Sequence, residues 1–265
     1  MRILYSYDAK ARIEKALAAF HRILTKANKK IAEGPARGLF FDSGLTTSQA
    51  FLLGNYERPV QEALFSILSK DAVFYDIGAN IGFFSILAAK TVGPGGSVYA
   101  FEPLSENASM IEKNANRNKL INIYVERVAV ADKTGKREII LTECAGGATL
   151  KTAGNPPDPI GSQVVETVAL DELAQSGRIK MPDVVKIDVE GAELDVLSGM
   201  AAILNKKAPS LIIEFDDVAL ISCKKKLSAA QELLEGIGYQ TKILSNSYND
   251  GSWFVRHLMA QKMPR

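Results

Sequence analysis

The chain has 265 residues, of which 47% are hydrophobic and 23% are charged, which suits one large α/β domain of a soluble protein with an addition at one end. Its formal net charge of +2 gives no bulk argument for nucleic-acid binding, and no apolar run is long enough to span a bilayer or to form the core of a secretion signal. Because Cys144 and Cys223 lie too far apart to suggest a disulfide or metal framework, we expect free thiols and a cytoplasmic protein.

Residues 1–53 are predicted to form a helical extension to the main domain. An amphipathic helix is expected over 9–31, because apolar side chains recur at helical spacing and a Gly-Pro pair follows. The apolar positions are Ile13, Leu17, Phe20, Leu24 and Ile31. The other faces are basic and would suit a membrane or an acidic partner, but Asp8 and Glu14 interrupt the basic run and favour a helix docked on the protein. The extension could also join two copies in a homodimer.

A second helix, predicted over 57–68, leads into a strand–helix–strand unit. Its inward-facing residues are expected to be Val60, Leu64, Phe65 and Leu68. The β-rich run 72–75 then ends in the carboxylate of Asp76, and after a glycine-bearing turn and an apolar helical run a second β run ends in Glu102. Glycines let a backbone approach a ligand closely, and a carboxylate after the second strand can accept two hydrogen bonds from a ribose diol. The unit is therefore expected to bind a nucleoside cofactor.

The turn of this unit distinguishes between two cofactors. A dinucleotide places its pyrophosphate at the turn and prefers the pattern G-x-G-x-x-G, with no anion nearby. Here Asn80 stands at the middle glycine position, and Asp76 would repel a pyrophosphate. S-adenosylmethionine (SAM) instead presents an ammonium and a sulfonium, which a carboxylate attracts. The unit favours SAM, and an NAD-dependent oxidoreductase is the alternative.

Strands and helices continue to alternate beyond Glu102. Helices are predicted over 105–117, 191–204 and 227–236, and strands over 121–130, 138–142, 184–187 and 211–215. The segment 145–163 is rich in Gly, Pro and Asn and is predicted to be a loop that could close over a substrate. A turn signal at 249–251, between the runs 239–244 and 252–256, predicts a closing hairpin. This order predicts a doubly wound, mostly parallel sheet whose last strand runs antiparallel.

Six blocks of this sequence are distinctive. They are GNYERPVQEAL at 54–64, VFYDIGANIGFFSILAAKTVGPGGSVYAFEP at 73–103, VERVAVADKTG at 125–135, VALDEL at 168–173, VVKIDVEGAELDVLSGM at 184–200 and PSLIIEF at 209–215. With these blocks the chain resembles the FkbM family of SAM-dependent methyltransferases over roughly residues 54–256. The resemblance implies a seven-stranded class I (Rossmann-like) methyltransferase domain, 54–265, that transfers a methyl group to a hydroxyl oxygen of a small molecule, sugar or glycan and releases S-adenosylhomocysteine. A scaffold that binds SAM without turnover is a further alternative.

Ligands of open α/β sheets sit beyond the carboxyl ends of the strands, so the residues there are the candidate cofactor contacts. The residues expected around the methionine end of SAM are Asp76, Gly78, Ala79, Asn80 and Gly82. Phe83 either covers this end or belongs to the core, and Glu102 is expected to hold the ribose hydroxyls. Ala131 is expected beside the adenine ring, and Asp132 either accepts from the adenine amino group or caps the following turn.

The catalytic candidates are carboxylates that follow the next two strands. Methyl transfer from a sulfonium is an in-line displacement, so positioning supplies most of the catalysis and a carboxylate orients or accepts the hydroxyl proton. Asp188, which ends the run 184–187 beside the expected position of the methyl group and also contacts SAM, is the preferred candidate. Glu190 on the following turn is next, and Glu214 is expected to face the same cleft.

Three further residues, Asp216, Glu193 and His257, have other candidate roles. Asp188 with Glu214 or Asp216 could hold Mg²⁺ through oxygen ligands, although a metal-free site is favoured. Glu193 is assigned to the helix dipole, because it falls in a predicted first turn. His257 is expected to be solvated after the last strand rather than to act as a base.

Overall fold

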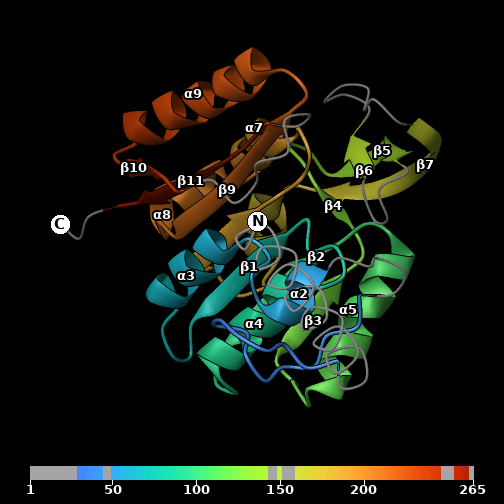
Figure 1. Ribbon diagram of the computed structural model, residues 1–265. Coiled ribbons are helices and arrows are strands. Elements are labelled where there is room, and N and C mark those ends of the chain that lie inside the picture. The colour runs from blue at the N-terminus through green and yellow to red at the C-terminus, as the bar shows by residue number, and fades with distance from the viewer. Residues whose placement is uncertain (1–28, 44–48, 143–147, 151–158, 246–253, 263–265) are drawn as a thin grey trace, which may run out of the picture.

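The computed structural model describes residues 29–43, 49–142, 148–150, 159–245 and 254–262, which form two β-sheets with helices packed on the larger one (Figure 1). The larger sheet has seven strands in the order β10-β11-β9-β8-β1-β2-β3. Its strands are β1 Val73–Ile77, β2 Ser97–Phe101, β3 Ile123–Glu126, β8 Val184–Ile187, β9 Ser210–Asp217, β10 Gln240–Ile243 and β11 Phe254–Gln261. All neighbours are parallel except β11, which is antiparallel to both β9 and β10. The predicted doubly wound, mostly parallel sheet is confirmed.

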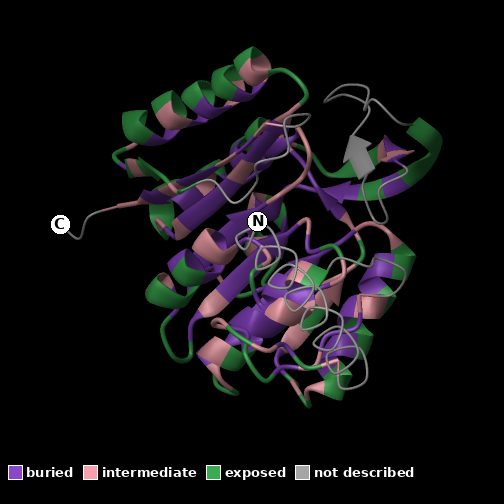
Figure 2. Ribbon diagram, viewed as in Figure 1, coloured by how far each residue is buried: buried purple, intermediate pink, exposed green. Residues whose placement is uncertain are grey.

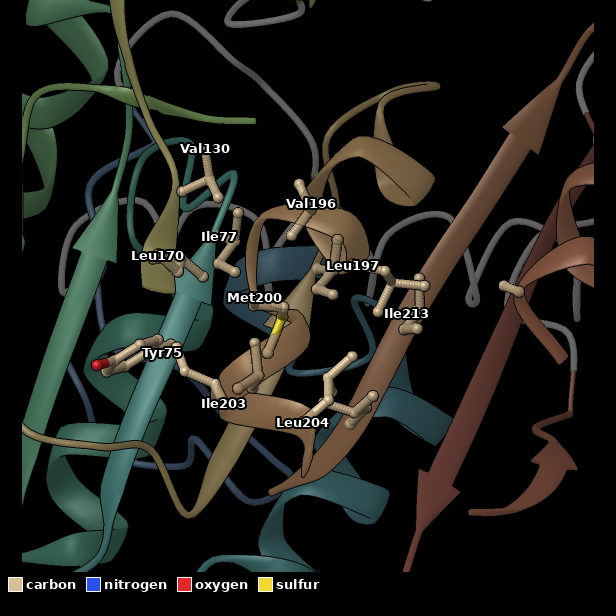
Figure 3. Packing of buried hydrophobic residues seen from close by; sticks show 14 of the residues in the cluster. Tyr75, Ile77, Val130, Leu170, Val196, Leu197, Met200, Ile203, Leu204 and Ile213 are labelled. Atoms are coloured by element: carbon tan, nitrogen blue, oxygen red, sulfur yellow. The ribbon is translucent and has the colours of Figure 1, made fainter. Parts of the chain in front are cut away.

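Helices cover both faces of this sheet. Successive residues of a strand point to opposite faces, so neighbouring side chains pack against different helices. Phe74 packs with α3 and α4 on one face, whereas Tyr75 packs with α7 and α8 on the other, where Figure 3 shows Tyr75 near Met200 and Ile203. The helices of the first face are α2 Gln49–Leu53, α3 Arg58–Ile67, α4 Phe83–Val92 and α5 Ser105–Arg117. Those of the second are α6 Leu170–Gln175, α7 Glu193–Gly199, α8 Ala201–Lys206 and α9 Leu220–Gly236.

The central strands of the sheet are buried on both faces (Figure 2). Such strands read as continuous apolar runs, since neither side meets water. A charged residue within them is therefore exceptional and must be paired or functional. Two central strands carry one: Asp76 lies in β1 and Lys186 in β8, and both are almost fully buried.

A smaller four-stranded sheet, in the order β4-β7-β5-β6, projects from the main body (Figure 1). Its strands are β4 Ala129–Val130, β5 Gly135–Thr142, β6 Ala148–Leu150 and β7 Pro159–Val168. The prediction of a loop over 145–163 is thus wrong at β6 and at the start of β7. The first half of β7 is exposed on both sides, so it carries no apolar alternation from which to recognise a strand. Residues 143–147 and 151–158 lie outside the described residues.

Other boundaries also differ from the predictions. The strand expected over 121–130 is two strands, β3 and β4, in different sheets. The helix expected over 191–204 divides into α7 and α8 at Met200, where φ is −122°. Gly199, just before this break, packs so closely that a Cβ there would lie 2.1 Å from the Ala131 carbonyl oxygen. The helix expected to begin at 227 is α9, which begins seven residues earlier.

The N-terminal predictions are tested only in part. Residues 9–28 of the expected helix lie outside the described residues, and 29–31 are not helical, because Lys30 pairs with Phe40 in an antiparallel bridge. In α3, Val60, Leu64 and Leu68 are buried as predicted, but Phe65 is 57% exposed. The hairpin turn at 249–251 is also outside the described residues. Among the helices that are described, none is both long and apolar enough to cross a membrane.

Candidate active site

A pocket opens at the carboxyl ends of β1, β2, β8 and β9, where ligands of doubly wound sheets bind. The described residues that line it are Phe51, Tyr56, Asp76, Gly78, Ala79, Asn80, Ile81, Phe83, Phe84, Phe101, Glu102, Pro103, Val128, Ala129, Val130, Ile139, Lys186, Asp188, Val189, Glu190 and Glu214. Nearly all the predicted cofactor and catalytic residues therefore meet in one place. The exceptions are Gly82, Ala131 and Asp132.

Asp76 offers this pocket a buried carboxylate with one oxygen to spare. Its Oδ2 accepts a hydrogen bond of 2.5 Å from the hydroxyl of Ser85, which α4 supplies. Its Oδ1 is buried and has no hydrogen-bond partner among the described residues. Burial raises the pKa of Asp76, and the nearby Lys186 opposes that rise. A buried oxygen without a partner is costly, so a ligand that donates a hydrogen bond or carries positive charge would bind favourably here.

The turn after β1 requires glycine at its first position. Gly78 has a φ of 76°, and a Cβ there would lie 1.7 Å from the carbonyl oxygen of Asp188. The close approach joins the end of β1 to the end of β8, so that both strand ends face one pocket. Asn80, with a φ of 50°, directs its N–H to the Glu102 carboxylate at 2.9 Å. Gly82 lies just behind the turn, where a Cβ would meet Ile111 of α5 at 3.0 Å.

Glu102 follows β2 and is held by the backbone around it. Its Oε2 accepts from Asn80, and its Oε1 accepts from the N–H of Leu104 at 2.9 Å and from Asn107 at 3.4 Å. Burial raises the pKa of Glu102 to about 7, against the opposing effect of these donors. Each carboxylate oxygen has more than one lone-pair direction, so hydroxyl donors from the pocket can add to these bonds.

Ala131 and Asp132 lie beyond the wall of the pocket. The chain leaves β3 at Glu126 and enters the smaller sheet at β4, so that Val128, Ala129 and Val130 line the pocket instead. Ala131 is fully buried, and Asp132 forms an ion pair with Arg137. The predicted strand 121–130 thus ends before Ala131 and Asp132, but the residues that line the pocket from this segment are Val128, Ala129 and Val130.

The opposite wall holds an ion pair that the sequence analysis did not identify. Lys186 of β8 is 2% exposed and places its Nζ 2.6 Å from Oδ2 of Asp188. The same Nζ lies 4.6 Å from the centre of the Phe84 ring, a cation–π contact. Burial disfavours the ammonium, but Asp188, Glu57, Asp76 and Glu214 outweigh it and raise the pKa of Lys186. The lysine is therefore charged and clamps Asp188 at the edge of the pocket.

Glu214 belongs to a second buried cluster on the same wall. His257 is 1% exposed in β11, and its Nε2 lies 2.6 Å from Oε2 of Glu214 and 3.6 Å from Oε2 of Glu57. The expectation of a solvated His257 is therefore wrong: the strand continues beyond 256, and residue 257 points into the core. Burial alone would lower the pKa of His257, but the two carboxylates raise it. Burial, with Asp188 and Glu57 nearby, raises the pKa of Glu214.

The remaining acids near the site have separate positions. Glu190 lines the pocket from the turn between β8 and α7, with a φ of 47°. Glu193 opens α7, is 1% exposed and accepts the N–H of Gly191 at 2.6 Å, in keeping with its predicted role at the helix start. Asp216 and Asp217 turn towards Lys226, which donates to the carbonyl oxygen of Asp216 and pairs with the carboxylate of Asp217.

The acids proposed for Mg²⁺ are not the ones that the structure brings closest together. Over the described part of the chain, the one group with three ligand atoms within 4.8 Å of one another is Glu57, Glu214 and His257. The Nε2–Oε2 contact of 2.6 Å in this group is a hydrogen bond. Glu57 could have been suspected from the block GNYERP, and Lys186 from its place within an apolar strand. The partners of His257 come from distant segments, which no local pattern reveals.

The strand order and the similarity to a solved methyltransferase show the Rossmann-like fold of class I methyltransferases. The profile of the methyltransferase FkbM domain matches residues 76–237, more than half of the chain, and the chain belongs to this family. Fold and family together imply SAM as the methyl donor and do not favour the NAD-dependent alternative.

Several known proteins are similar to this chain. The hexuronic acid methyltransferase AglP of Haloferax volcanii is 31% identical over 144 residues, which are 54% of this chain and 56% of AglP. The 31-O-demethyl-FK506 methyltransferase FkbM of Streptomyces tacrolimicus is 27% identical over 55% of this chain and 66% of that protein. The crystal structure of methyltransferase FkbM from Methylobacillus flagellatus KT has a TM-score of 0.51 and 18% identity, over 72% of this chain and 44% of that one, which supports the fold. The chain thus spans little more than half the length of AglP.

Proposed function

We propose that this protein transfers a methyl group from SAM to a hydroxyl oxygen of a small molecule or sugar. The observation that carries the proposal is the pairing, in one pocket, of a wall suited to SAM with a wall of half-buried carboxylates. Asp76, Gly78 and Glu102 form the first wall, and Asp188 and Glu214 belong to the second. The names of AglP and of the Streptomyces relative, which describe a sugar acid and an oxygen position, support an oxygen acceptor.

The first wall fits the polar groups of SAM. The spare Oδ1 of Asp76 suits the ammonium of the methionine part, and the backbone beside Gly78 leaves room for a ligand that a side chain would fill. Glu102 accepts the ribose hydroxyls, and Val128, Ala129 and Ile139 offer an apolar surface to the adenine ring. We extend the cofactor site to these three residues, in place of Ala131 and Asp132.

The second wall positions the acceptor. When bound, SAM supplies a methyl group on a sulfonium, which an oxygen attacks in line. Asp188 is clamped by Lys186, which stabilises its charge, so we assign it to orienting the acceptor hydroxyl by accepting its hydrogen bond. Burial raises the pKa of Glu214, so its ionised carboxylate is a stronger base than that of an exposed glutamate, and we assign it to accept the proton. Glu190 borders the same space and contacts the acceptor from the turn.

The test of the proposed function begins with calorimetric titration of S-adenosylhomocysteine and, separately, NADH. We expect micromolar binding of S-adenosylhomocysteine alone, which Asp76→Ala and Glu102→Ala abolish. Glu193→Gln is the matched control, because Glu193 is equally buried but does not line the pocket. Binding of NADH in place of S-adenosylhomocysteine would refute the proposal. Radiolabelled SAM with a panel of hydroxylated acceptors then tests transfer to oxygen.

A further inference from the structure

His257 and Glu214 are brought together by strand pairing. β9 and β11 are antiparallel neighbours, and their register sets His257 directly opposite Glu214. Residues opposite each other in such a pair point to the same face of the sheet. The Nε2–Oε2 distance of 2.6 Å is therefore a consequence of the register, and the bond is held by two strands rather than by a flexible loop.

Glu57 reaches the same imidazole from the first face of the molecule. It immediately precedes α3 and has a φ of 40°, a left-handed conformation that is unfavourable for a glutamate. The residue is 3% exposed, and its Oε2 lies 3.6 Å from Nε2 of His257. Strain of this kind persists where surrounding structure requires it, often at functional sites. We define Glu57, His257 and Glu214 as the buried triad.

One member of the buried triad meets the pocket. The side chain of Glu214 is 14% exposed and lines the pocket, whereas those of His257 and Glu57 are 0% and 1% exposed. Nδ1 of His257 is buried and has no hydrogen-bond partner among the described residues, so both carboxylates of the triad face the other ring nitrogen, Nε2. The imidazole therefore acts on Glu214 through Nε2, by its charge and its hydrogen bond.

The charges around the buried triad explain why Glu214 needs a cation beside it. Lys186 and Asp188 of β8 interact with Glu214. Asp76 of β1 interacts with Glu57, and Tyr56 forms a hydrogen bond with Glu57. Lys186 is already engaged by Asp188 at 2.6 Å. The imidazole of His257 is thus the cation that can compensate Glu214 directly, with Glu57 on its other side to keep it protonated.

We propose that His257 and Glu57 are positioning residues: His257 favours the charged form of the Glu214 carboxylate, and Glu57 holds the imidazole that aims this carboxylate into the pocket, where it accepts the proton of the acceptor hydroxyl. This proposal rests on the proposed methyl transfer. The O–H bond breaks towards Glu214, the oxygen pair forms the O–CH₃ bond, and the C–S pair leaves on sulfur. Once the product has left, water removes the proton from Glu214.

Imidazole NMR tests the triad without knowledge of the acceptor. The sequence contains two histidines, so ¹⁵N-histidine labelling of the His21→Gln variant leaves the signal of His257 alone. We expect a doubly protonated ring at pH 7, with an Nε2 proton that exchanges slowly. Glu214→Gln and Glu57→Gln should each lower the pKa of His257 by at least one unit. Glu193→Gln should leave it unchanged.

The second measurement follows Glu214 itself by ¹³C-carboxyl NMR. His257→Gln keeps a donor beside Oε2 but removes the charge, so it should raise the pKa of Glu214 while the affinity for S-adenosylhomocysteine stays within about twofold. With an accepted hydroxyl substrate, kcat at pH 7 should fall at least tenfold, KM should change little, and raising the pH should restore part of the rate.

Three outcomes would overturn the proposal. One is a His257 that titrates near 6.5 in the wild-type protein, and another is a Glu214 whose pKa does not respond to His257→Gln. The third is broadening of the His257 signal by micromolar Mn²⁺, which would identify the buried triad as a metal site. None of these depends on methyl transfer. Loss of S-adenosylhomocysteine binding by the wild-type protein would instead refute the proposed function.

Discussion

In Glu102, ligand binding favours the charged form of the carboxyl group, whereas burial favours its protonated form. Binding of ribose hydroxyls needs an acceptor, which the carboxylate provides, yet the group is 5% exposed and burial raises its pKa to about 7. In the unfolded chain the same group would release its proton near 4.5. Between pH 4.5 and 7 the folded state therefore retains a proton that the unfolded state has released. Once Glu102 is charged, its burial lowers the stability of the ligand-free protein.

This predicts a pH-dependent effect of Glu102→Gln. The free energy of unfolding of the variant, relative to wild type, should rise as pH increases from 4.5 to 7 and then level off, by at most about 3 kcal/mol. Urea denaturation at pH 4.5, 6 and 8 measures this difference. A constant difference at all three pH values would contradict the assignment.

For single residues, the sequence predicts the position of a side chain where the neighbouring residues along the chain define the strand or helix that carries it. Asp76, Glu102 and Asp188 each follow an apolar strand, so their place at a strand end could be predicted. Lys186 lies inside such a strand, so the sequence indicates a buried charge there but does not indicate the partner that compensates it. His257 was misjudged because its burial depends on the pairing of β11 with β9, which joins residues 43 positions apart.

Among the elements, the smaller sheet has the least obvious role. It supplies Ile139 and β4 to the pocket wall and buries a small apolar cluster that includes Val165 and Ala192. Arg137 of β5 forms ion pairs with Asp132, just after β4, and with Asp195 of α7 at 2.9 Å. These contacts tie the sheet to the main body beside the surface that we assign to adenine.

Arg137→Ala should therefore loosen the adenine side of the pocket. We expect a loss of stability of about 1 kcal/mol, since the ion pairs are partly exposed, and an affinity for S-adenosylhomocysteine several times weaker than wild type. Lys136→Ala, also in β5, is the matched control, because its pair with Glu166 of β7 is well exposed. Calorimetry and thermal denaturation provide the two readouts. Equal behaviour of the two variants would show that the docking is irrelevant to the cofactor.

Strands could be predicted where both of their faces are buried, and helices where apolar residues recur at helical spacing. The strand expected at 184–187 matches β8 residue for residue, and the expected helix at 105–117 matches α5. β7 could not be recognised, because its first half is exposed on both sides and its apolar residues there, Ile160 and Val164, show no alternation. β4 was merged with β3, since nothing local indicates that two adjacent runs enter different sheets.

Over the whole molecule, the net charge of +2 conceals an acidic pocket. Among the described residues that line the pocket, five are acids and Lys186 is the one cation. The acids are Asp76, Glu102, Asp188, Glu190 and Glu214. In a buried space such charges act at close range and are poorly screened. An anionic acceptor would meet repulsion there.

We predict that neutral hydroxylated acceptors are preferred over their acidic counterparts. With matched pairs such as methyl glucosides and methyl glucuronides, kcat/KM should favour the neutral member by at least tenfold, roughly 1.4 kcal/mol. Lys186 cannot reverse this, because Asp188 already engages it. This prediction separates the protein from AglP, whose name specifies a hexuronic acid. A preference for the glucuronide in initial-rate assays would contradict it.

The strand order also bears on how the protein matures during synthesis. The wall around Asp76 and Glu102 comes from one contiguous strand–helix–strand unit, which leaves the ribosome before the rest of the sheet. The opposite wall needs Glu57, Glu214 and His257, and β11 must insert between β9 and β10 before the histidine arrives. A nascent chain could thus acquire its donor-binding half early and its acceptor-activating half only near the end of translation, so that methyl transfer would await completion of the sheet.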